Sequence, residues 1–465
     1  MIYIDRNIKK PIYEQIYSYF TEEILSGSLP AGTQLPATRK LAEELSIGRN
    51  TVDKAYQQLA AEGYIQSKAC SGFTVNKIPS GIYAEPVPDP IHHETVIKKK
   101  QPLYDFAYGN MDNSVFPYNL WRKCINNALS FLELTNTIKY PERIGESALR
   151  KEISSYLYHS RGVKCEPAQV VITCGQQHSM EIIANIFGNI EKKGFAMEDP
   201  GYDGIRTVFL NHRFNMSYIP VEKDGINMDY VYKLDTDLLY ITPSHQFPTG
   251  AVLSVGKRKE LLNWAETTNT YIIEDDYDSE LRYYTNPIPA MQSLDKKERT
   301  IYTGTFSKSL SPSMRLAYII FPKTLLAEFY NYYQRYNSQV STLHQLALAE
   351  FISAGYYERH INRLRTLYKK KQSALLAAIY KVFENNIEVH GEGAGIHLLL
   401  NVKGTQCQEE LIEKAESADI RLYPSRPLYA ISSRCPDNQL LIGFPTVPEK
   451  SFKEIMMLLK DAWKL

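Results

Sequence analysis

The segment YTGTFSKSLSPSMRLAY, at residues 302–318, carries the residue types that can hold a cofactor with an aldehyde and a phosphate. Lys308 lies at the end of an expected strand among small hydroxyl residues, so its amine can form a Schiff base with an aldehyde. Thr305, Ser307 and Arg315 can hold the phosphate through charge-assisted hydrogen bonds. A lysine among hydroxyl residues is a weak signal by itself, and the prediction depends on the elements around it.

A second element, YIIEDDYDSE at residues 271–280, indicates a buried strand that ends in acidic residues. An acid at this strand end can face a pyridine nitrogen and keep it protonated, the state in which the ring withdraws electrons. Asp275 is the predicted acid, and Tyr277 is predicted to contact the phenolic oxygen of the ring. Without the lysine segment, Asp275 and Asp276 would be equally compatible with a solvated turn.

A third element, VVITCGQQHSMEII at residues 170–183, predicts a strand, a glycine turn and a helix. The backbone N–H groups of Gly175, Gln176 and Gln177 would lie at the helix N-terminus and form a phosphate cradle. A turn of this kind is common and by itself is more often only structural.

Two loops supply further candidates around the ring. Tyr202, in EDPGYDG at residues 198–204, follows a tight turn and can stack on the ring. In TPSHQFPTG, at residues 242–250, the polar candidates near the ring oxygen are Ser244, His245 and Gln246, although His245 is equally compatible with a loop histidine without a role. Together the five elements predict a site for pyridoxal 5'-phosphate (PLP), which combines an aldehyde, a phosphate and a pyridine ring.

These elements must be positioned by an α/β domain. From residue 104 to residue 465, helical segments alternate with short apolar runs, which predicts a mainly parallel sheet followed by a C-terminal α+β subdomain. A chain of 465 residues is too long for one ordinary domain. Residues 76–103 are rich in proline, contain a lysine run and lack apolar periodicity, so they are predicted to be a semi-rigid linker.

The first 75 residues predict a separate module. Helices are expected over residues 11–26, from 38 to 45 with Thr38 as a cap, and from 49 to about 62, followed by two short strands within residues 63–75. Three helices with a tight turn between the last two, and then a hairpin, are typical of a winged helix-turn-helix.

The charged and polar residues of this module indicate double-stranded DNA as a partner. Side chains at the start of the third helix can reach phosphates and base edges in a major groove. An arginine of the preceding helix can hold a phosphate, and the hairpin can contact the minor groove or the backbone. The alternative is a small packing module with solvated charges, since its local charge is nearly balanced. The predicted DNA-contacting residues are Arg39, Arg49, Asn50, Thr51, Lys54, Lys68, Ser71 and Gly72.

Overall composition excludes some classes of protein. The chain has 53 Lys and Arg against 52 Asp and Glu, a net charge of +1, so any DNA binding must come from local pattern and not from a global field. We find no long apolar run and no secretory signal pattern, so we expect a cytoplasmic protein without membrane contact. The cysteines are scattered without metal-site spacing, and no metal is predicted.

The N-terminal module resembles the GntR-type winged helix. The resemblance lies in PATRKLA at residues 36–42, RNTVDKAY at 49–56 and LAAEG at 59–63. One departure is Gly48, where the family commonly has Ser, which removes a cap or a phosphate contact.

The five elements of the large domain, in their order, resemble the fold-type I aminotransferases. Together with the winged helix they look like the MocR/GabR regulators of the GntR superfamily. The resemblance implies a bacterial transcription regulator that carries PLP on Lys308, binds promoter DNA and responds to a small molecule. It also implies a head-to-tail, domain-swapped homodimer. The alternative is an active aminotransferase with an appended DNA-binding domain.

One departure from this family concerns the substrate's carboxylate. Aminotransferases bind it with an arginine shortly before the last apolar strand, where this chain has Asp437, with Arg434 nearby. A second arginine of the GABA-responsive regulator corresponds to Gly204, with Arg206 close by. Because an acid would repel a carboxylate, our hypothesis is that the effector is PLP itself, with an amino compound as the alternative.

Overall fold

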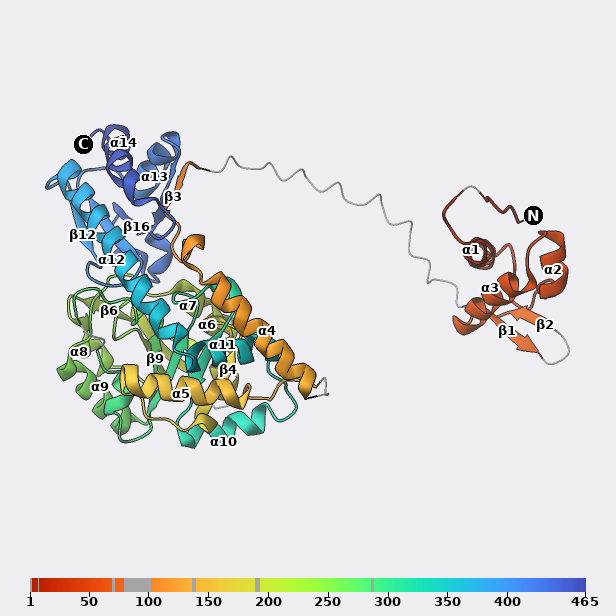
Figure 1. Ribbon diagram of the computed structural model, residues 1–465, viewed down its shortest axis with the longest axis horizontal. Helices are drawn as coiled ribbons and strands as arrows, with labels where there is room; N and C mark the ends of the chain where they lie inside the picture. The colour runs from red at the N-terminus through yellow and green to blue at the C-terminus, as the bar shows by residue number, and fades with distance from the viewer. Residues whose placement is uncertain are drawn as a thin grey trace. The chain divides into compact units, whose positions relative to one another are not determined.

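A computed structural model describes residues 2–6, 8–68, 72–78, 102–135, 139–188, 193–285 and 288–465. The chain divides into two compact units, residues 1–100 and residues 101–465 (Figure 1). Most of the predicted linker, from residue 79 to residue 101, lies outside the described residues.

The first unit is the predicted winged helix. Apolar residues at helical spacing on α1 and α3, such as Ile16, Phe20, Tyr56 and Leu59, are buried together, and Tyr56 packs edge-to-face against both Phe20 and Phe73. This packing joins the hairpin and the first helix to α3. The elements are α1 (Ile12–Leu25), α2 (Thr38–Glu44), α3 (Arg49–Ala61), β1 (Ile65–Lys68) and β2 (Gly72–Val75), with the two strands antiparallel.

One detail of this unit differs from the prediction. Thr38 is the first residue of α2, and the cap position is held by Ala37, without a side-chain hydrogen bond. The prediction that Thr38 caps the helix is therefore wrong by one position, since a threonine inside the first turn cannot accept the bonds that a capping side chain accepts.

The second unit is built on an eight-stranded sheet. The sheet is mainly parallel, as predicted, because six of its eight strands run in one direction and β11 and β7 run in the other. In spatial order its strands are β4 (Val170–Thr173), β11 (Ala317–Ile320), β10 (Thr300–Thr305), β9 (Tyr271–Asp276), β8 (Leu238–Ile241), β5 (Gly194–Asp199), β6 (Asn215–Glu222) and β7 (Gly225–Ile226).

Both faces of this sheet are buried. Side chains alternate between faces along a strand, and Val170 and Ile172 accordingly join one apolar cluster while Val171 joins another. One face is covered by α4 (Tyr118–Leu134), α5 (Ser147–Arg161), α8 (Met228–Val231), α9 (Val255–Thr268) and α11 (Thr342–Ser353), and the other by α6 (Gln176–Phe187), α7 (Asp203–Asn211) and α10 (Lys323–Tyr332) (Figure 1).

The C-terminal part forms the predicted α+β subdomain. Its antiparallel sheet has the order β12, β13, β16, β15, and the long helix α12 contacts both β12 and α14. A separate strand, β3, pairs in parallel with β14 and so ties the start of the unit to its end. The elements are β3 (Tyr104–Asp105), α12 (Tyr356–Phe383), β12 (Ile387–His390), β13 (His397–Val402), α13 (Gln408–Ser417), β14 (Ile420–Arg421), β15 (Tyr423–Pro424), β16 (Gln439–Gly443) and α14 (Phe452–Trp463).

The strand directions bring five chain segments to one edge of the large sheet. Strands β5, β8, β9 and β10 are parallel, and β4 has the same direction because β11 is antiparallel to both β4 and β10. In open α/β sheets, ligands bind beyond such carboxyl ends. Over the described ranges of the chain, no helix is long and apolar enough to cross a membrane.

Candidate functional site

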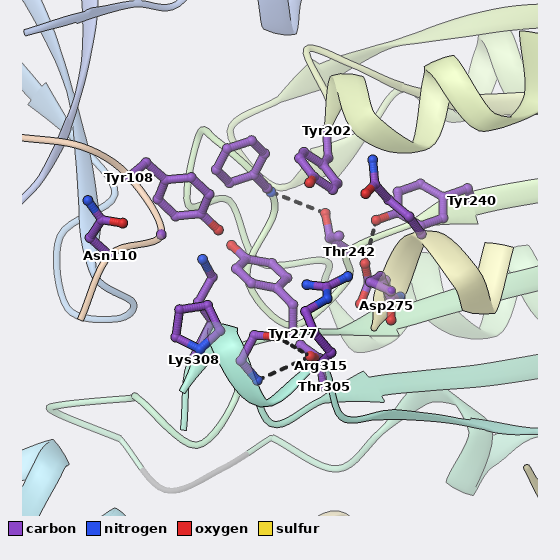
Figure 2. A pocket seen from close by; sticks show the side chains of 16 residues that line it. Tyr108, Asn110, Tyr202, Tyr240, Thr242, Asp275, Tyr277, Thr305, Lys308 and Arg315 are labelled. Carbon is purple, nitrogen blue, oxygen red and sulfur yellow. Dashed lines mark hydrogen bonds between the residues drawn. The ribbon is translucent and has the colours of Figure 1, made fainter. Parts of the chain in front are cut away.

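A cavity of about 400 Å³ lies at this edge of the sheet (Figure 2). Its wall combines the carboxyl ends of β8, β9 and β10 and the segments that follow β4, β5, β8, β9 and β10 with residues that precede α4. The lining residues are Tyr108, Gly109, Asn110, Gln176, Gln177, Tyr202, Tyr240, Thr242, Phe247, Asp275, Tyr277, Thr305, Ser307, Lys308, Pro312 and Arg315.

Lys308 follows β10 and presents its amino group to the cavity (Figure 2). The Nζ atom lies 4.2 Å from the centroid of the Tyr108 ring. Burial lowers the pKa of Lys308 to about 8, and the charge of Asp278 opposes this shift. A lysine with a lowered pKa has a larger neutral fraction near neutral pH, which is the form that attacks an aldehyde carbon.

Asp275, at the end of β9, offers an unpaired acceptor. The Tyr240 hydroxyl donates to its Oδ2 atom, whereas its Oδ1 atom is buried and has no hydrogen-bond partner among the described residues. Burial raises the pKa of Asp275 to about 7. Leaving a buried acceptor without a hydrogen bond costs free energy, so a ligand that donates a hydrogen bond to Oδ1 would be stabilised. A protonated pyridine nitrogen is a donor of this kind.

Another part of the cavity wall has the composition of a phosphate site. Thr305 and Ser307 share a hydrogen bond of 2.9 Å between their hydroxyl oxygens, and Arg315 donates to the carbonyl oxygen of Cys174. Gly175 has a φ of +93°, and a Cβ atom there would clash with the Arg315 guanidinium. The helix α6 starts directly after this glycine, so its first N–H groups face the same place.

Aromatic side chains form the rest of the wall. Tyr108 packs on Phe247 with ring centroids 4.7 Å apart, and Phe247 forms T-shaped pairs with Tyr202 and Tyr277. Figure 2 shows the hydroxyl groups of Tyr108 and Tyr277 facing the amino group of Lys308. Such a wall suits a planar ring held between aromatic faces.

Ten of the eleven residues predicted to hold the cofactor meet at this cavity. Nine of them line it, and Gly175 packs against Arg315 beside it. Gln246 is the exception: its side-chain amide donates to the carbonyl oxygens of Pro200 and Phe247, so it faces away from the cavity, and Phe247 lines the wall instead. Ser244 and His245, the other polar candidates of that loop, are also absent from the lining; Ser244 accepts a hydrogen bond from Arg161.

Several lining residues were missed by the sequence interpretation. Thr242 follows β8 at the same sheet edge, and the rule that located Asp275 could have identified it. Tyr240 is on β8, all of whose residues are buried, so the sequence does not distinguish it from the core residues beside it. Tyr108 and Asn110 come from a segment without any motif, and the pairing of β3 with β14 is what anchors that segment.

The arginines near the expected carboxylate site are already engaged. Arg434 donates to Asp199 over 2.9 Å, and Arg206 donates to the carbonyl oxygen of Pro427 over 2.6 Å. Asp437 is exposed and pairs with Arg426 at 3.3 Å. Among the described residues that line the cavity, the cationic side chains are Lys308 and Arg315.

In the first unit, the predicted DNA-contacting residues are mostly at the surface. Arg39 and Asn50 are exposed, Arg49 is exposed and pairs with Asp53 over 3.3 Å, and the amino group of Lys54 lies 3.7 Å from the centroid of the Tyr13 ring. Thr51 is partly buried, and Gly72 starts β2 with a φ of +80°. Ser71 and the side chain of Lys68 lie outside the described residues.

No cluster of three or more His, Cys, Asp or Glu side chains able to hold a metal ion occurs within the part of the chain that the structure describes.

Two family models match the chain. Residues 12–75 match the bacterial regulatory proteins of the gntR family, and residues 105–424 match aminotransferase class I and II. Among solved structures, an archaeal alanine:glyoxylate aminotransferase superimposes with a TM-score of 0.72 at 22% identity, covering 79% of this chain and 92% of that one. At that identity the likeness shows the fold alone, and it confirms the predicted aminotransferase-like architecture.

Curated relatives match over almost the whole length. The uncharacterized HTH-type transcriptional regulator YdeL of Bacillus subtilis is 39% identical, covering 100% of this chain and 99% of the relative. The probable rhizopine catabolism regulatory protein MocR of Rhizobium meliloti is 31% identical, over 100% and 96%. The pyridoxine biosynthesis transcriptional regulator PdxR of Corynebacterium glutamicum is 28% identical, over 95% and 94%. The chain therefore belongs to the MocR family of transcriptional regulators, in which a GntR-type helix-turn-helix domain is fused to an aminotransferase-like domain.

Proposed function

We propose that this regulator binds PLP covalently through Lys308 and that a small ligand acting at the same cavity changes its binding to promoter DNA. The observation that carries the proposal is the meeting of Lys308, Asp275 and Arg315 in one cavity with an aromatic wall. These residues supply a nucleophilic amine, an unpaired buried acceptor and a phosphate-binding cation.

The residues fit the parts of PLP. When bound, the cofactor would supply an aldehyde that reacts with amines and a ring that withdraws electrons. Asp275 would accept from the ring nitrogen, Tyr202 would stack on the ring, and Tyr277 would face the phenolic oxygen. The phosphate would lie against Thr305, Ser307, Arg315 and the N-terminus of α6, formed by Gly175, Gln176 and Gln177.

We further propose PLP itself as the effector, with an amino compound as the second candidate. The proposal is supported by the positions of Arg434 and Arg206, neither of which is among the residues that line the cavity. Arg434 instead donates to Asp199, and Arg206 donates to the carbonyl oxygen of Pro427. It is also supported by the relative PdxR, which is named for pyridoxine biosynthesis.

On DNA, we propose a head-to-tail homodimer that places two winged helices on two half-sites about one helical turn or more apart, in direct repeat or as separate half-sites. Arg49, Asn50 and Thr51 at the start of α3 would enter the major groove, with Arg39 on a phosphate. On binding, the Arg49 side chain would leave its ion pair with Asp53 and contact the DNA instead.

The test is binding of the purified protein to the DNA upstream of its own gene and of neighbouring genes, titrated with PLP at constant salt. Salt must be constant because phosphate contacts make affinity steeply salt-dependent. Specific binding that changes with PLP is the expected result. Specific binding indifferent to PLP would exclude PLP as the effector and favour an amino compound. Absence of specific binding would refute this proposal.

The second candidate function is a working aminotransferase. It is favoured by the presence of nine predicted cofactor-holding residues in the cavity wall, which suit amine chemistry at Lys308. A single-turnover experiment with PLP-loaded protein and amino acids would test it by the change in cofactor absorbance. Turnover with a second substrate at rates typical of enzymes, about 1 per second or faster, would support this alternative.

A further inference from the structure

Behind Tyr277 lies a buried pair of side chains that the proposed function does not use. The Nδ1 atom of His245 lies 2.8 Å from Oδ2 of Asp278 and 3.1 Å from the hydroxyl oxygen of Tyr277. His245 is 3% exposed and Asp278 is 2% exposed. Tyr277 lines the cavity, whereas the other two lie outside its wall.

A glycine loop of the C-terminal subdomain covers this pair. Gly395 has a φ of +66°, and a Cβ atom there would clash with the His245 ring and lie 2.7 Å from Oδ2 of Asp278. The N–H group of Gly395 donates to the carbonyl oxygen of Leu281 over 2.8 Å, which holds the loop in place. The His245 ring therefore packs tightly and has a defined orientation.

The contacts determine which atom carries the proton of the imidazole. A carboxylate accepts hydrogen bonds and does not donate them, so Nδ1 of His245 must be the donor toward Asp278. The Nε2 atom is buried and has no hydrogen-bond partner within the described part of the chain. The hydroxyl of Tyr277 thus faces an N–H group, toward which its oxygen can only accept.

The proton of the Tyr277 hydroxyl must then point away from His245. Figure 2 shows this hydroxyl at the cavity, facing Lys308. Phe247 is next to Tyr277 in the wall, with ring centroids 6.1 Å apart. Its side chain has no polar group, so it cannot accept the hydrogen bond of the Tyr277 hydroxyl in place of a ligand. Tyr277 is therefore a hydrogen-bond donor aimed into the cavity.

We propose that Asp278 and His245 are positioning residues that orient the Tyr277 hydroxyl so that it donates to the phenolic oxygen of bound PLP. This inference rests on the proposed function, since it requires PLP in the cavity. The pair acts through Tyr277 and touches neither the cofactor nor the effector.

The experiment compares isosteric variants of the full-length, PLP-loaded protein. His245→Gln removes the donor at the Nδ1 position, whereas His245→Asn retains an amide N–H near it. We expect His245→Gln to weaken PLP binding about threefold to tenfold, the range for one lost hydrogen bond, and to shift the visible absorbance band of the bound cofactor. His245→Asn should restore most of both properties. Asp278→Asn keeps the side-chain shape and provides a second test where His245→Gln fails to fold.

A double-mutant cycle separates positioning from other effects. The charge of Asp278 also raises the pKa of Lys308, and this electrostatic effect would persist in a variant that lacks the Tyr277 hydroxyl. We expect His245→Gln to have no further effect on PLP affinity or absorbance in a Tyr277→Phe background. An undiminished effect in that background, or an unchanged affinity and spectrum in the single variant, would overturn the positioning role. Failure of the wild-type protein to bind PLP would instead refute the proposed function.

Discussion

The lowered pKa of Lys308 makes a quantitative prediction about how fast PLP attaches. Attack on the aldehyde needs the neutral amine, and burial lowers the pKa from its usual 10.5 to about 8. At pH 7 about one amine in eleven would be neutral with this pKa, against roughly one in 3,000 for an ordinary lysine. The protein should therefore react roughly 300-fold faster than a solvent-exposed lysine of equal intrinsic reactivity.

The assay is stopped-flow mixing of PLP with protein from which PLP has been removed, followed by absorbance across a range of pH. Because the pKa is lowered, the neutral fraction increases as pH rises and saturates above the folded-state pKa. We expect the rate constant to rise about tenfold per pH unit below pH 8 and to level off above it. Lys308→Ala, measured in parallel, corrects for reaction at surface lysines.

A rate that keeps rising tenfold per unit to about pH 10 would refute this reasoning, because it would show an amine with an ordinary pKa. Asp278→Asn provides an internal check on the electrostatics. The Asp278 charge raises the pKa of Lys308, so its removal should start the plateau at a lower pH.

Three further predictions concern single side chains. Arg49→Ala should weaken operator binding and relax the base preference of one position in each half-site, measured by fluorescence anisotropy on operators that differ by single base pairs, and an unchanged affinity and preference would exclude a major-groove contact of Arg49. Gly175→Ala should lower PLP affinity by about tenfold or more, since its Cβ would displace Arg315, whereas Gly404→Ala, at a positive φ with no atoms nearby, should leave that affinity unchanged in equilibrium titrations. Asp275→Asn should weaken PLP binding by about tenfold in the same titrations, and equal affinity would show that Oδ1 does not meet the ring nitrogen.

Much of the fold could be predicted because its signals are local. The apolar spacing of residues 11–26 predicted α1, which the structure bounds at Ile12 and Leu25. The apolar starts of the segments at residues 170–183 and 271–280 predicted strands that correspond to β4 and β9. The error at Thr38 concerns the start of α2. The same sequence pattern is compatible with a helix that begins at Thr38 or one residue after it.

The site was predictable where it follows directly from strand ends. Lys308 comes shortly after the end of β10, and Asp275 lies near the end of β9. These two strands are parallel, so their carboxyl ends lie at the same edge of the sheet. Gln246 was misplaced because residue type alone does not show which of two adjacent loop side chains points inward. Phe247 occupies the wall instead, where its ring packs against Tyr108.

By itself, the sequence determined the two kinds of domain, the order of their elements and the lysine, acid and arginine that suit PLP, since periodicity and short motifs depend on residues near one another in the chain. Only the tertiary structure decided what surrounds those residues. The contact of Tyr108 with Lys308, the engagement of Arg434 by Asp199 and the pairing of His245 with Asp278 each join distant segments. Such contacts depend on how strands and loops pack in space, and no local pattern specifies that packing.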